Sequence, residues 1–241
     1  MSTPHAAVTK ILTGIRGFDE ITDGGIPRQR TTLVTGGPGC GKTVFALQSL
    51  VYGASKMRES GLFVAFEEST GHIIANAATF GWDIKALSKK KLYFFDARLG
   101  PDVVNAGEFD LSGMLSVLEA KAREIRAKRI VFDGIDVLLS LLDDPAAERR
   151  ELYRIRDWLA RTGLTAVITQ KTGTHVDQEA SERSPIPQRY NYLQFMVDCV
   201  VVLRHQVVNG SAFRTLRVMK YRGSGFSGDE FPITVPRKAC S

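Results

Sequence analysis

A glycine-rich segment, residues 36–43, constrains the fold of this chain more than any other feature. It follows a β-branched, apolar run at Thr31–Thr35 and precedes Thr43–Lys56, where apolar residues recur at helical spacing. A strand, a glycine-rich turn and a helix in this order direct backbone N–H groups and a helix N-terminus at one point, where they can bind phosphate. The spacing matches G-x-x-x-x-G-K-[ST], which predicts ATP binding. The segment consists of Gly36, Gly37, Pro38, Gly39, Cys40, Gly41, Lys42 and Thr43.

A candidate Mg²⁺ site follows from the same segment and one acid further along the chain. Lys42 would reach the β- and γ-phosphates, and the Thr43 hydroxyl would ligate Mg²⁺. The buried run Arg129–Asp133 ends on an acid, and Asp133 would hold the ion through water. Many buried strands end in aspartate, so this interpretation depends on the glycine-rich segment.

Two adjacent carboxylates, Glu67 and Glu68, end the run that follows the first helix. One of them could act as a general base that takes a proton from the attacking water, and Glu67 is also a candidate metal ligand. An acidic strand end exposed to solvent would have the same sequence. Their place at the carboxyl edge of an open α/β sheet favours a role in the site.

Strands and helices alternate along most of the chain, which predicts an α/β fold with a mostly parallel sheet and flanking helices. A short amphipathic stretch, Ile11–Ile21, precedes this alternation, and loops are expected at 98–109 and 171–189. Asn209-Gly210 between two late strands predicts an antiparallel hairpin at one edge. The expected strands are Thr31–Thr35, Leu62–Phe66, Leu92–Phe95, Arg129–Asp133, Leu164–Thr169, Val197–Leu203, Thr215–Met219 and Phe231–Val235; the expected helices are Thr43–Lys56, Thr70–Phe80, Leu111–Arg126 and Pro145–Arg161.

Composition sets the remaining limits. The 241 residues are 44% hydrophobic and 24% charged, which is usual for a globular protein. We expect one domain, with a core at about 11–235 and a separate tail at 236–241. No apolar run approaches the roughly 20 residues of a membrane span, so a cytoplasmic location is expected. Three cysteines form no metal-binding pattern, and the net charge of +6 suits an anionic ligand without identifying one.

With these elements in place, the chain resembles the RecA-like ATPases, and within them the KaiC family of circadian clock ATPases. The resemblance extends from about Ile11 to Val235 and favours the ATP-hydrolysing half of the tandem family proteins over the autokinase half. Its markers are Gly14-Ile15-Arg16-Gly17-Phe18-Asp19, Gly24-Gly25-Ile26-Pro27, Phe66-Glu67-Glu68, Phe80-Gly81-Trp82, Phe109-Asp110-Leu111-Ser112, Arg149-Arg150-Glu151-Leu152 and Lys220-Tyr221-Arg222-Gly223.

The resemblance implies a hexameric ring with ATP at each subunit junction. Glu67 would be the catalytic carboxylate, with Glu68 beside it. Lys220 and Arg222 would reach the γ-phosphate from the neighbouring subunit, where a cation offsets the charge that develops on the phosphoryl group. Taken without the resemblance, these two cations would be exposed strand residues. Further nucleotide contacts are implied at Val44, Thr79, Tyr221, Ser224 and Phe226.

The chain departs from the family pattern at three places. Cys40 stands where threonine is common, and we expect a small buried packing residue there. The adjacent Ser-Thr phosphoacceptor pair of the autokinase half has no counterpart at Phe195-Met196-Val197-Asp198, so autophosphorylation is not expected, although Thr172 and Thr174 offer hydroxyls. The tail after Val235 also differs, which leaves any nucleotide contacts there in question.

Three functions remain open from the sequence. The first is a ring ATPase that couples slow hydrolysis to oligomer state and to a signalling or clock-type protein partner. The second is a DNA-dependent recombination ATPase of the RecA or RadA type; against it, the loop at 171–189 lacks interleaved basic and aromatic residues. The third is a nucleotide-sensing adaptor without turnover, which retention of both Glu67 and Glu68 disfavours.

Overall fold

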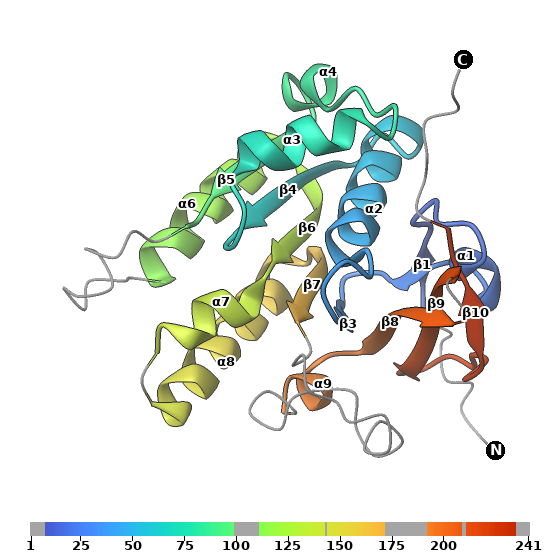
Figure 1. Cartoon of the computed structure of the whole chain (residues 1–241). Coiled ribbons are helices and arrows are strands. Elements are labelled where there is room, and N and C mark those ends of the chain that lie inside the picture. Colours follow the sequence, from blue (N-terminus) through green and yellow to red (C-terminus); the bar gives the residue numbers. More distant parts are fainter. Residues whose placement is uncertain (1–7, 99–110, 143, 172–191, 209–210, 235–241) are drawn as a thin grey trace, which may run out of the picture.

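An eight-stranded, mostly parallel sheet organises the chain in the computed structural model (Figure 1), which describes residues 8–98, 111–142, 144–171, 192–208 and 211–234. The strand order is β10-β9-β8-β3-β7-β6-β4-β5, and the pairs from β8 to β5 are parallel. The predicted α/β architecture is confirmed. The strands are β3 (Thr31–Gly36), β4 (Ser60–Ala65), β5 (Leu92–Asp96), β6 (Ala127–Asp133), β7 (Thr165–Lys171), β8 (Cys199–Val208), β9 (Ser211–Tyr221) and β10 (Glu230–Pro232).

The antiparallel extension is also confirmed, although its strands are longer than predicted. β8 and β9 pair from Cys199↔Tyr221 to Val208↔Ser211, and β10 adds to the outer edge of β9. The turn residues 209–210 lie outside the described residues, as do residues 99–110, 172–191 and 235–241, where the two expected loops and the tail fall. The hairpin leaves β3 in the interior of the sheet, between β7 and β8.

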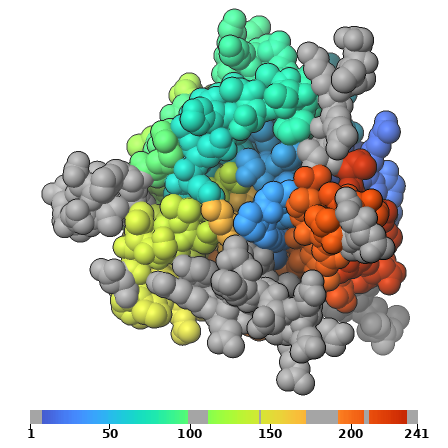
Figure 2. All heavy atoms as spheres, in the orientation of Figure 1, coloured from blue at the N-terminus to red at the C-terminus, as the bar shows by residue number. Residues whose placement is uncertain are grey.

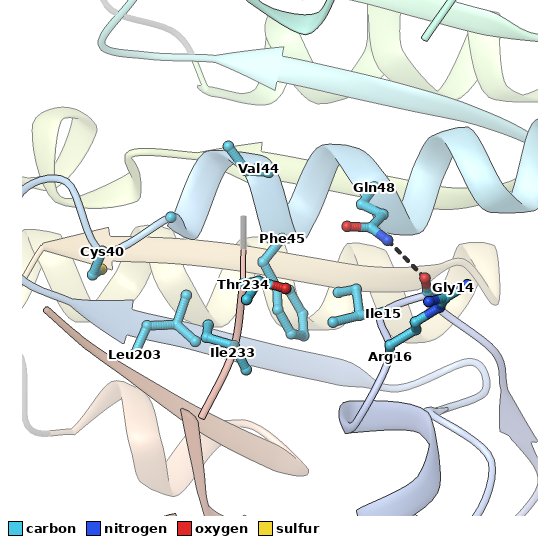
Figure 3. A pocket seen from close by; sticks show the side chains of 11 residues that line it. Gly14, Ile15, Arg16, Cys40, Val44, Phe45, Gln48, Leu203, Ile233 and Thr234 are labelled. Atoms are coloured by element: carbon cyan, nitrogen blue, oxygen red, sulfur yellow. Dashed lines mark hydrogen bonds between the residues drawn. The ribbon is translucent and has the colours of Figure 1, made fainter. Parts of the chain in front are cut away.

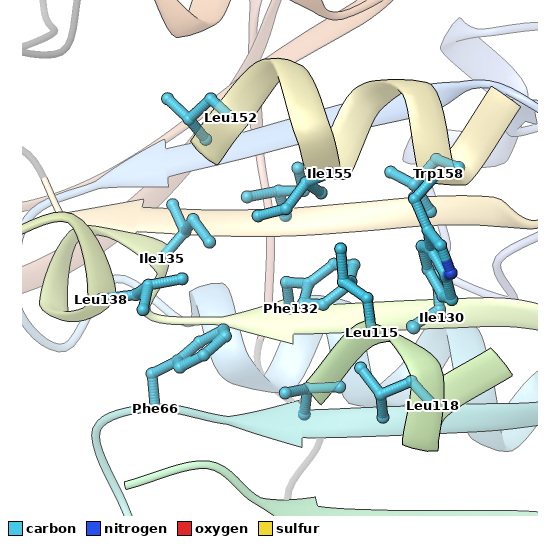
Figure 4. Close-up of a cluster of buried hydrophobic side chains, with 14 of the residues drawn as sticks. Phe66, Leu115, Leu118, Ile130, Phe132, Ile135, Leu138, Leu152, Ile155 and Trp158 are labelled. Atoms are coloured by element: carbon cyan, nitrogen blue, oxygen red, sulfur yellow. The ribbon is translucent and has the colours of Figure 1, made fainter. Parts of the chain in front are cut away.

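Helices cover both faces of the sheet. The face with α2, α3 and α4 buries Phe45, Ile73 and Ile84 against the strands, and the opposite face buries side chains from α6, α7 and α8. On the face covered by α6, α7 and α8, Phe132 of β6 packs edge-on against the Trp158 ring (Figure 4). The helices are α2 (Lys42–Lys56), α3 (Thr70–Ala78), α4 (Ile84–Ser88), α6 (Leu111–Glu124), α7 (Ile135–Ser140), α8 (Pro145–Thr162) and α9 (Leu193–Met196). Within the described residues, no helix is long and apolar enough to cross a membrane.

The N-terminal stretch differs most from its sequence pattern. Residues 11–21 do not form one element, because a loop separates β1 (Lys10–Ile11), paired with β2 (Ile26–Pro27), from α1 (Phe18–Ile21). The Asp19 carboxylate accepts hydrogen bonds from the backbone N–H groups of Thr13 (3.0 Å) and Gly14 (2.8 Å), which fixes this loop. Three short helices, α4, α7 and α9, were also absent from the sequence prediction.

Arg129, at the start of β6, joins the N-terminal loop to the helix that follows the glycine-rich segment. Its guanidinium is 2% exposed; Nε donates to Glu59 Oε2 (2.8 Å), and Nη1 donates to the carbonyls of Leu12 (2.8 Å) and Ser49 (3.0 Å). Gly53 of α2 leaves the space that the guanidinium occupies, since a Cβ there would lie 2.6 Å from Arg129 Nε. Burial lowers the pKa of Arg129, and the hydrogen bond to Glu59 opposes that shift.

We predict that Arg129→Met lowers the free energy of unfolding by about 1.5–3 kcal/mol, because it removes a buried guanidinium that donates to the Glu59 carboxylate and to two backbone carbonyls. Chemical denaturation measures this value. Arg154→Met, which removes an exposed ion pair to Glu151 on α8, is the matched control and should cost less than about 1 kcal/mol. Equal losses in the two variants would contradict the role assigned to Arg129.

Candidate phosphate-binding site

The glycine-rich segment connects the end of β3 to the start of α2, as predicted. Its glycines are required by close approach and by backbone conformation. A Cβ on Gly36 would lie 2.2 Å from the Leu203 carbonyl oxygen, and Gly41 precedes the helix with φ at 102°, in the left-handed region. The first N–H groups of α2 therefore face the loop without a side-chain cap, which leaves them available to an anion.

Lys42 folds back over this loop. Its Nζ donates to the carbonyl oxygens of Gly36 and Gly37, both at 2.8 Å. Cys40 lies beneath it and is fully buried, which confirms the packing role expected for that residue, and burial raises the pKa of its thiol. The ammonium group is thus held beside the backbone N–H groups that would contact phosphate.

Asp133 and Thr43 meet at the carboxyl end of the sheet. The Thr43 hydroxyl lies 3.0 and 3.2 Å from the two carboxylate oxygens of Asp133, and the Thr169 hydroxyl donates to Oδ1 at 2.6 Å. Thr169 also accepts from the N–H of Gly134 (2.8 Å). Burial raises the pKa of Asp133, while the hydrogen bonds from Thr169 and Thr43 oppose that shift.

These oxygen atoms suit Mg²⁺, which binds few protein ligands and completes its shell with phosphates and water. Thr43 and Asp133 supply a hydroxyl and a carboxylate on adjacent elements, so the residues present fit the ion. Among the described residues, no group of three or more His, Cys, Asp or Glu side chains could hold a metal ion. Mg²⁺ commonly takes the rest of its coordination shell from substrate phosphates and water.

Glu67 and Glu68 follow β4 and line the same cavity as the glycine-rich segment. Glu67 forms an ion pair with Lys171, and the Glu68 carboxylate accepts from Asn76 Nδ2 at 3.2 Å. This phosphate cavity, as we name it, has a volume of about 460 Å³. Figure 2 shows the blue residues of the loop and α2 at the centre of this face, between the cyan residues of α3 and the orange strands. The phosphate cavity is lined by Pro38, Gly39, Lys42, Thr43, Glu67, Glu68, Asp133, Gly134, Asp136, Thr169 and Lys171.

Two further cavities flank the first turn of α2, and Val44 lines both. One lies between the N-terminal loop and β8, where Phe45, Leu203 and Ile233 form an apolar wall and Gln48 Nε2 donates to the Gly14 carbonyl at 2.6 Å (Figure 3). The other contains Thr79, whose hydroxyl donates to the Asn76 carbonyl. Val44 and Thr79 are thus next to the phosphate cavity, where the base or ribose of a nucleotide would extend.

The remaining predicted contacts lie away from this chain's own phosphate cavity. Lys220 donates to the Gln194 carbonyl (2.6 Å) and Arg222 to the Phe195 carbonyl (3.1 Å), both in α9. Arg214, at the other end of β9, donates to the Gly39 carbonyl. Since a strand rises roughly 3.3 Å per residue, Lys220 lies about 20 Å further along β9 than the residue at the loop. Burial lowers the pKa of Lys220, and the neighbouring Arg222 lowers it further.

Three other predicted residues lie near this pair on the chain. The Tyr221 side chain is buried and donates to the Gly25 carbonyl at 3.0 Å, so only its backbone could contact a nucleotide. Ser224 and Phe226 follow β9 and are exposed or partly exposed. The structure therefore brings together the glycine-rich segment, both glutamates and Asp133, but does not bring the residues from Lys220 to Phe226 to them within one chain.

Sequence reasoning missed Thr169, Lys171 and Asp136 as parts of the cavity. The first two end β7, which pairs directly with β3, and the rule that sites lie at the carboxyl ends of parallel strands could have indicated them. Asp136 lies in a short helix that the pattern did not reveal. Burial raises the pKa of Asp136, and its hydrogen bond from the Lys171 N–H (3.0 Å) opposes that shift.

Comparisons with known proteins agree with this geometry. The family model described as "ATPase: KaiC" matches residues 11–240. The circadian clock oscillator protein KaiC of Prochlorococcus marinus is 41% identical over 230 residues, which are 95% of this chain and 44% of that protein. The circadian clock protein KaiC2 of Synechocystis sp. is 38% identical over 237 residues, 98% of this chain and 40% of that protein. The chain thus spans less than half the length of these relatives.

We predict that Thr169→Val lowers the free energy of unfolding by about 1–3 kcal/mol, because the isosteric change leaves the buried N–H of Gly134 without an acceptor and removes a donor to Asp133. Urea denaturation measures this loss. Thr162→Val at the end of α8, where the hydroxyl donates to a carbonyl of its own helix, should change stability by less than about 0.5 kcal/mol. A neutral Thr169→Val would show that the Asp133 network does not depend on this hydroxyl.

Proposed function

The chain belongs to the KaiC family of ATPases, and from this premise we propose that it binds ATP with Mg²⁺ and hydrolyses it slowly in a ring of identical subunits. One observation carries the proposal: Lys42, Thr43, Asp133 and Glu67 line a single cavity at the carboxyl end of the sheet. Hydrolysis needs a group that binds phosphate, a position for the metal ion and a base, and the grouping of these four side chains supports those roles for them. We propose that the chain acts as one ATPase domain in the cytoplasm.

Each residue of the phosphate cavity would have a separate role in hydrolysis. The N–H groups of residues 37–43 and the Lys42 ammonium would bind the β- and γ-phosphates, and bound Mg²⁺ would offset their negative charge. Glu67 would orient a water molecule against the γ-phosphate and accept its proton. Glu68, bonded to Asn76, is placed to stabilise the helix side of the cavity.

The same chain does not complete the site, and we propose that a neighbouring subunit does. Lys220 lies about 20 Å along β9 from the contact with the glycine-rich loop, and Arg222 follows the strand directly; these positions support their action on the next subunit's γ-phosphate. Adjacent cations repel each other, so an anion placed between subunits would relieve that repulsion. Hydrolysis would then depend on assembly, which suits a hexameric ring that reports its nucleotide state to a protein partner of the signalling or clock type.

Gel filtration with and without ATP, combined with a phosphate-release assay, tests the function as a whole. We expect ATP-dependent oligomers and hydrolysis without nucleic acid. Strong stimulation by single-stranded DNA, with a steep dependence on salt, would support the DNA-dependent recombinase alternative, which the family match does not favour. Binding without turnover would support an adaptor.

Replacement of the candidate base should separate assembly from chemistry. We predict that Glu67→Gln keeps ATP-dependent assembly but slows phosphate release by about 10²-fold or more, the usual scale for loss of a general base. Lys42→Ala is the comparison variant and should lose both nucleotide binding and assembly. Unchanged turnover in Glu67→Gln would eliminate this residue as the base.

The contribution of a second subunit can be tested by mixing variants. We predict that Arg222→Ala still binds nucleotide at its own glycine-rich loop but hydrolyses it poorly. When Arg222→Ala and Glu67→Gln chains are mixed in equal amounts and reassembled, roughly a quarter of head-to-tail junctions combine an intact Glu67 with an intact Arg222. Turnover of the mixture should exceed that of either variant alone. No recovery in a mixture shown to co-assemble would contradict action between subunits.

A further inference from the structure

We infer that Lys171 is a positioning residue that restrains Glu67, so that the ion pair between them limits the rate at which this ATPase turns over. The inference rests on the proposed role of Glu67 as the base. It assigns a function to a residue that neither the glycine-rich pattern nor the acidic strand ends point to.

Lys171 is held in the cavity by its backbone. In the parallel register of β3 and β7, Lys171 is the partner of Gly36, so its Cα is level with the start of the glycine-rich loop. Its N–H donates to Asp136 Oδ1 at 3.0 Å, which ties the end of β7 to the first turn of α7. The side chain therefore begins from a fixed point at the cavity wall.

From that point the Lys171 ammonium forms an ion pair with Glu67 Oε1. Gly134 leaves space for the Glu67 side chain, since a Cβ on Gly134 would lie 3.3 Å from Glu67 Cβ. Both members of the pair are partly exposed, at 42% and 46%, so substrate and solvent can reach them. An exposed pair is weak enough to break during turnover, yet it orders the carboxylate between turnovers.

The charges of the cavity make Lys171 the specific partner of Glu67. Among the described residues, the lysines that line the cavity are Lys42 and Lys171, and Lys42 donates to the carbonyls of Gly36 and Gly37 instead. The groups that line the cavity with Glu67 are Lys171 from β7, Asp133 from β6, Asp136 from α7, Lys42 from α2 and the adjacent Glu68. Among the described residues that line the cavity, Lys171 is thus the lysine whose positive charge pairs with the negative charge of Glu67.

The consequence for hydrolysis follows from geometry. One oxygen of Glu67 is occupied by an ammonium group that donates to it, so the water to be activated must compete for that oxygen or use the other one. Removal of the ammonium should therefore raise kcat, while the arginine variant should preserve the restraint.

Steady-state phosphate release at saturating ATP tests the inference. We expect Lys171→Met, which keeps side-chain length and removes the charge, to raise kcat about two- to fivefold, the range for loss of a solvent-accessible ion pair. Lys171→Arg should stay within about twofold of the unmodified chain. Lys121→Met is the matched control, because it removes a lysine ion pair to Glu124 on α6, and it should leave kcat unchanged. An unchanged or lower kcat in Lys171→Met would overturn the inference.

Two measurements distinguish loss of the restraint on Glu67 from a loss of overall stability. With a non-hydrolysable ATP analogue bound, Mn²⁺ binding followed by electron paramagnetic resonance should tighten about two- to fivefold in Lys171→Met, because the carboxylates lose their compensating charge. The Tm of this variant should stay close to that of Lys121→Met. Unchanged Mn²⁺ affinity would overturn the inference even if kcat rose.

The double variant distinguishes the two proposals. Glu67→Gln with Lys171→Met should be no faster than Glu67→Gln alone, since Lys171 is inferred to act only through the carboxylate. If Glu67→Gln is slow but Lys171→Met gives no gain, only the role of Lys171 fails. If Glu67→Gln turns over normally, the proposed base and the inferred restraint fail together.

Discussion

The hydrogen bonds that join Thr43, Asp133 and Thr169 connect the helix after the glycine-rich loop to two central strands. They bring a hydroxyl from α2 and a carboxylate from β6 to one point, and Thr169 from β7 fixes the orientation of that carboxylate. Because Asp133 is almost fully buried, its charge depends on these donors. The junction also reaches the start of α7, because Thr169 accepts a hydrogen bond from the Gly134 N–H.

A second buried polar network holds α2 near its middle. Arg129 binds Glu59 and the carbonyls of Leu12 and Ser49, so the helix is held to the start of β6 and to the N-terminal loop. Helix α2 is thus held by polar contacts at Thr43 in its first turn and at Ser49 near its middle, and along its length by apolar contacts. Such support keeps a binding site in one geometry.

The strand–loop–helix unit and the sheet type could be predicted because local patterns specify them. Glycine spacing around Lys42, the apolar runs and the turn at Asn209-Gly210 carry that information within a few residues. The short helices α4, α7 and α9 could not be predicted, because helices of four to six residues depend on tertiary packing. Lys171 was missed because its pairing with Gly36 joins residues far apart in the chain; only the rule that sites lie at the carboxyl ends of parallel strands points to it.

Strand β9 has a mechanical consequence. Near one end of β9, Arg214 donates to the glycine-rich loop. At the other end, Lys220 and the residue just after the strand, Arg222, donate to carbonyls of α9. β9 is paired with β8 along its length and with β10 at residues 215–217, so it resists bending and stretching, and a shift at one end is transmitted to the other. In a ring, each β9 would connect one subunit junction to the next. Loss of phosphate at one junction would then displace Lys220 and Arg222, the cations proposed to act at the next junction. Coordination around such a ring would then require no element beyond the sheet itself.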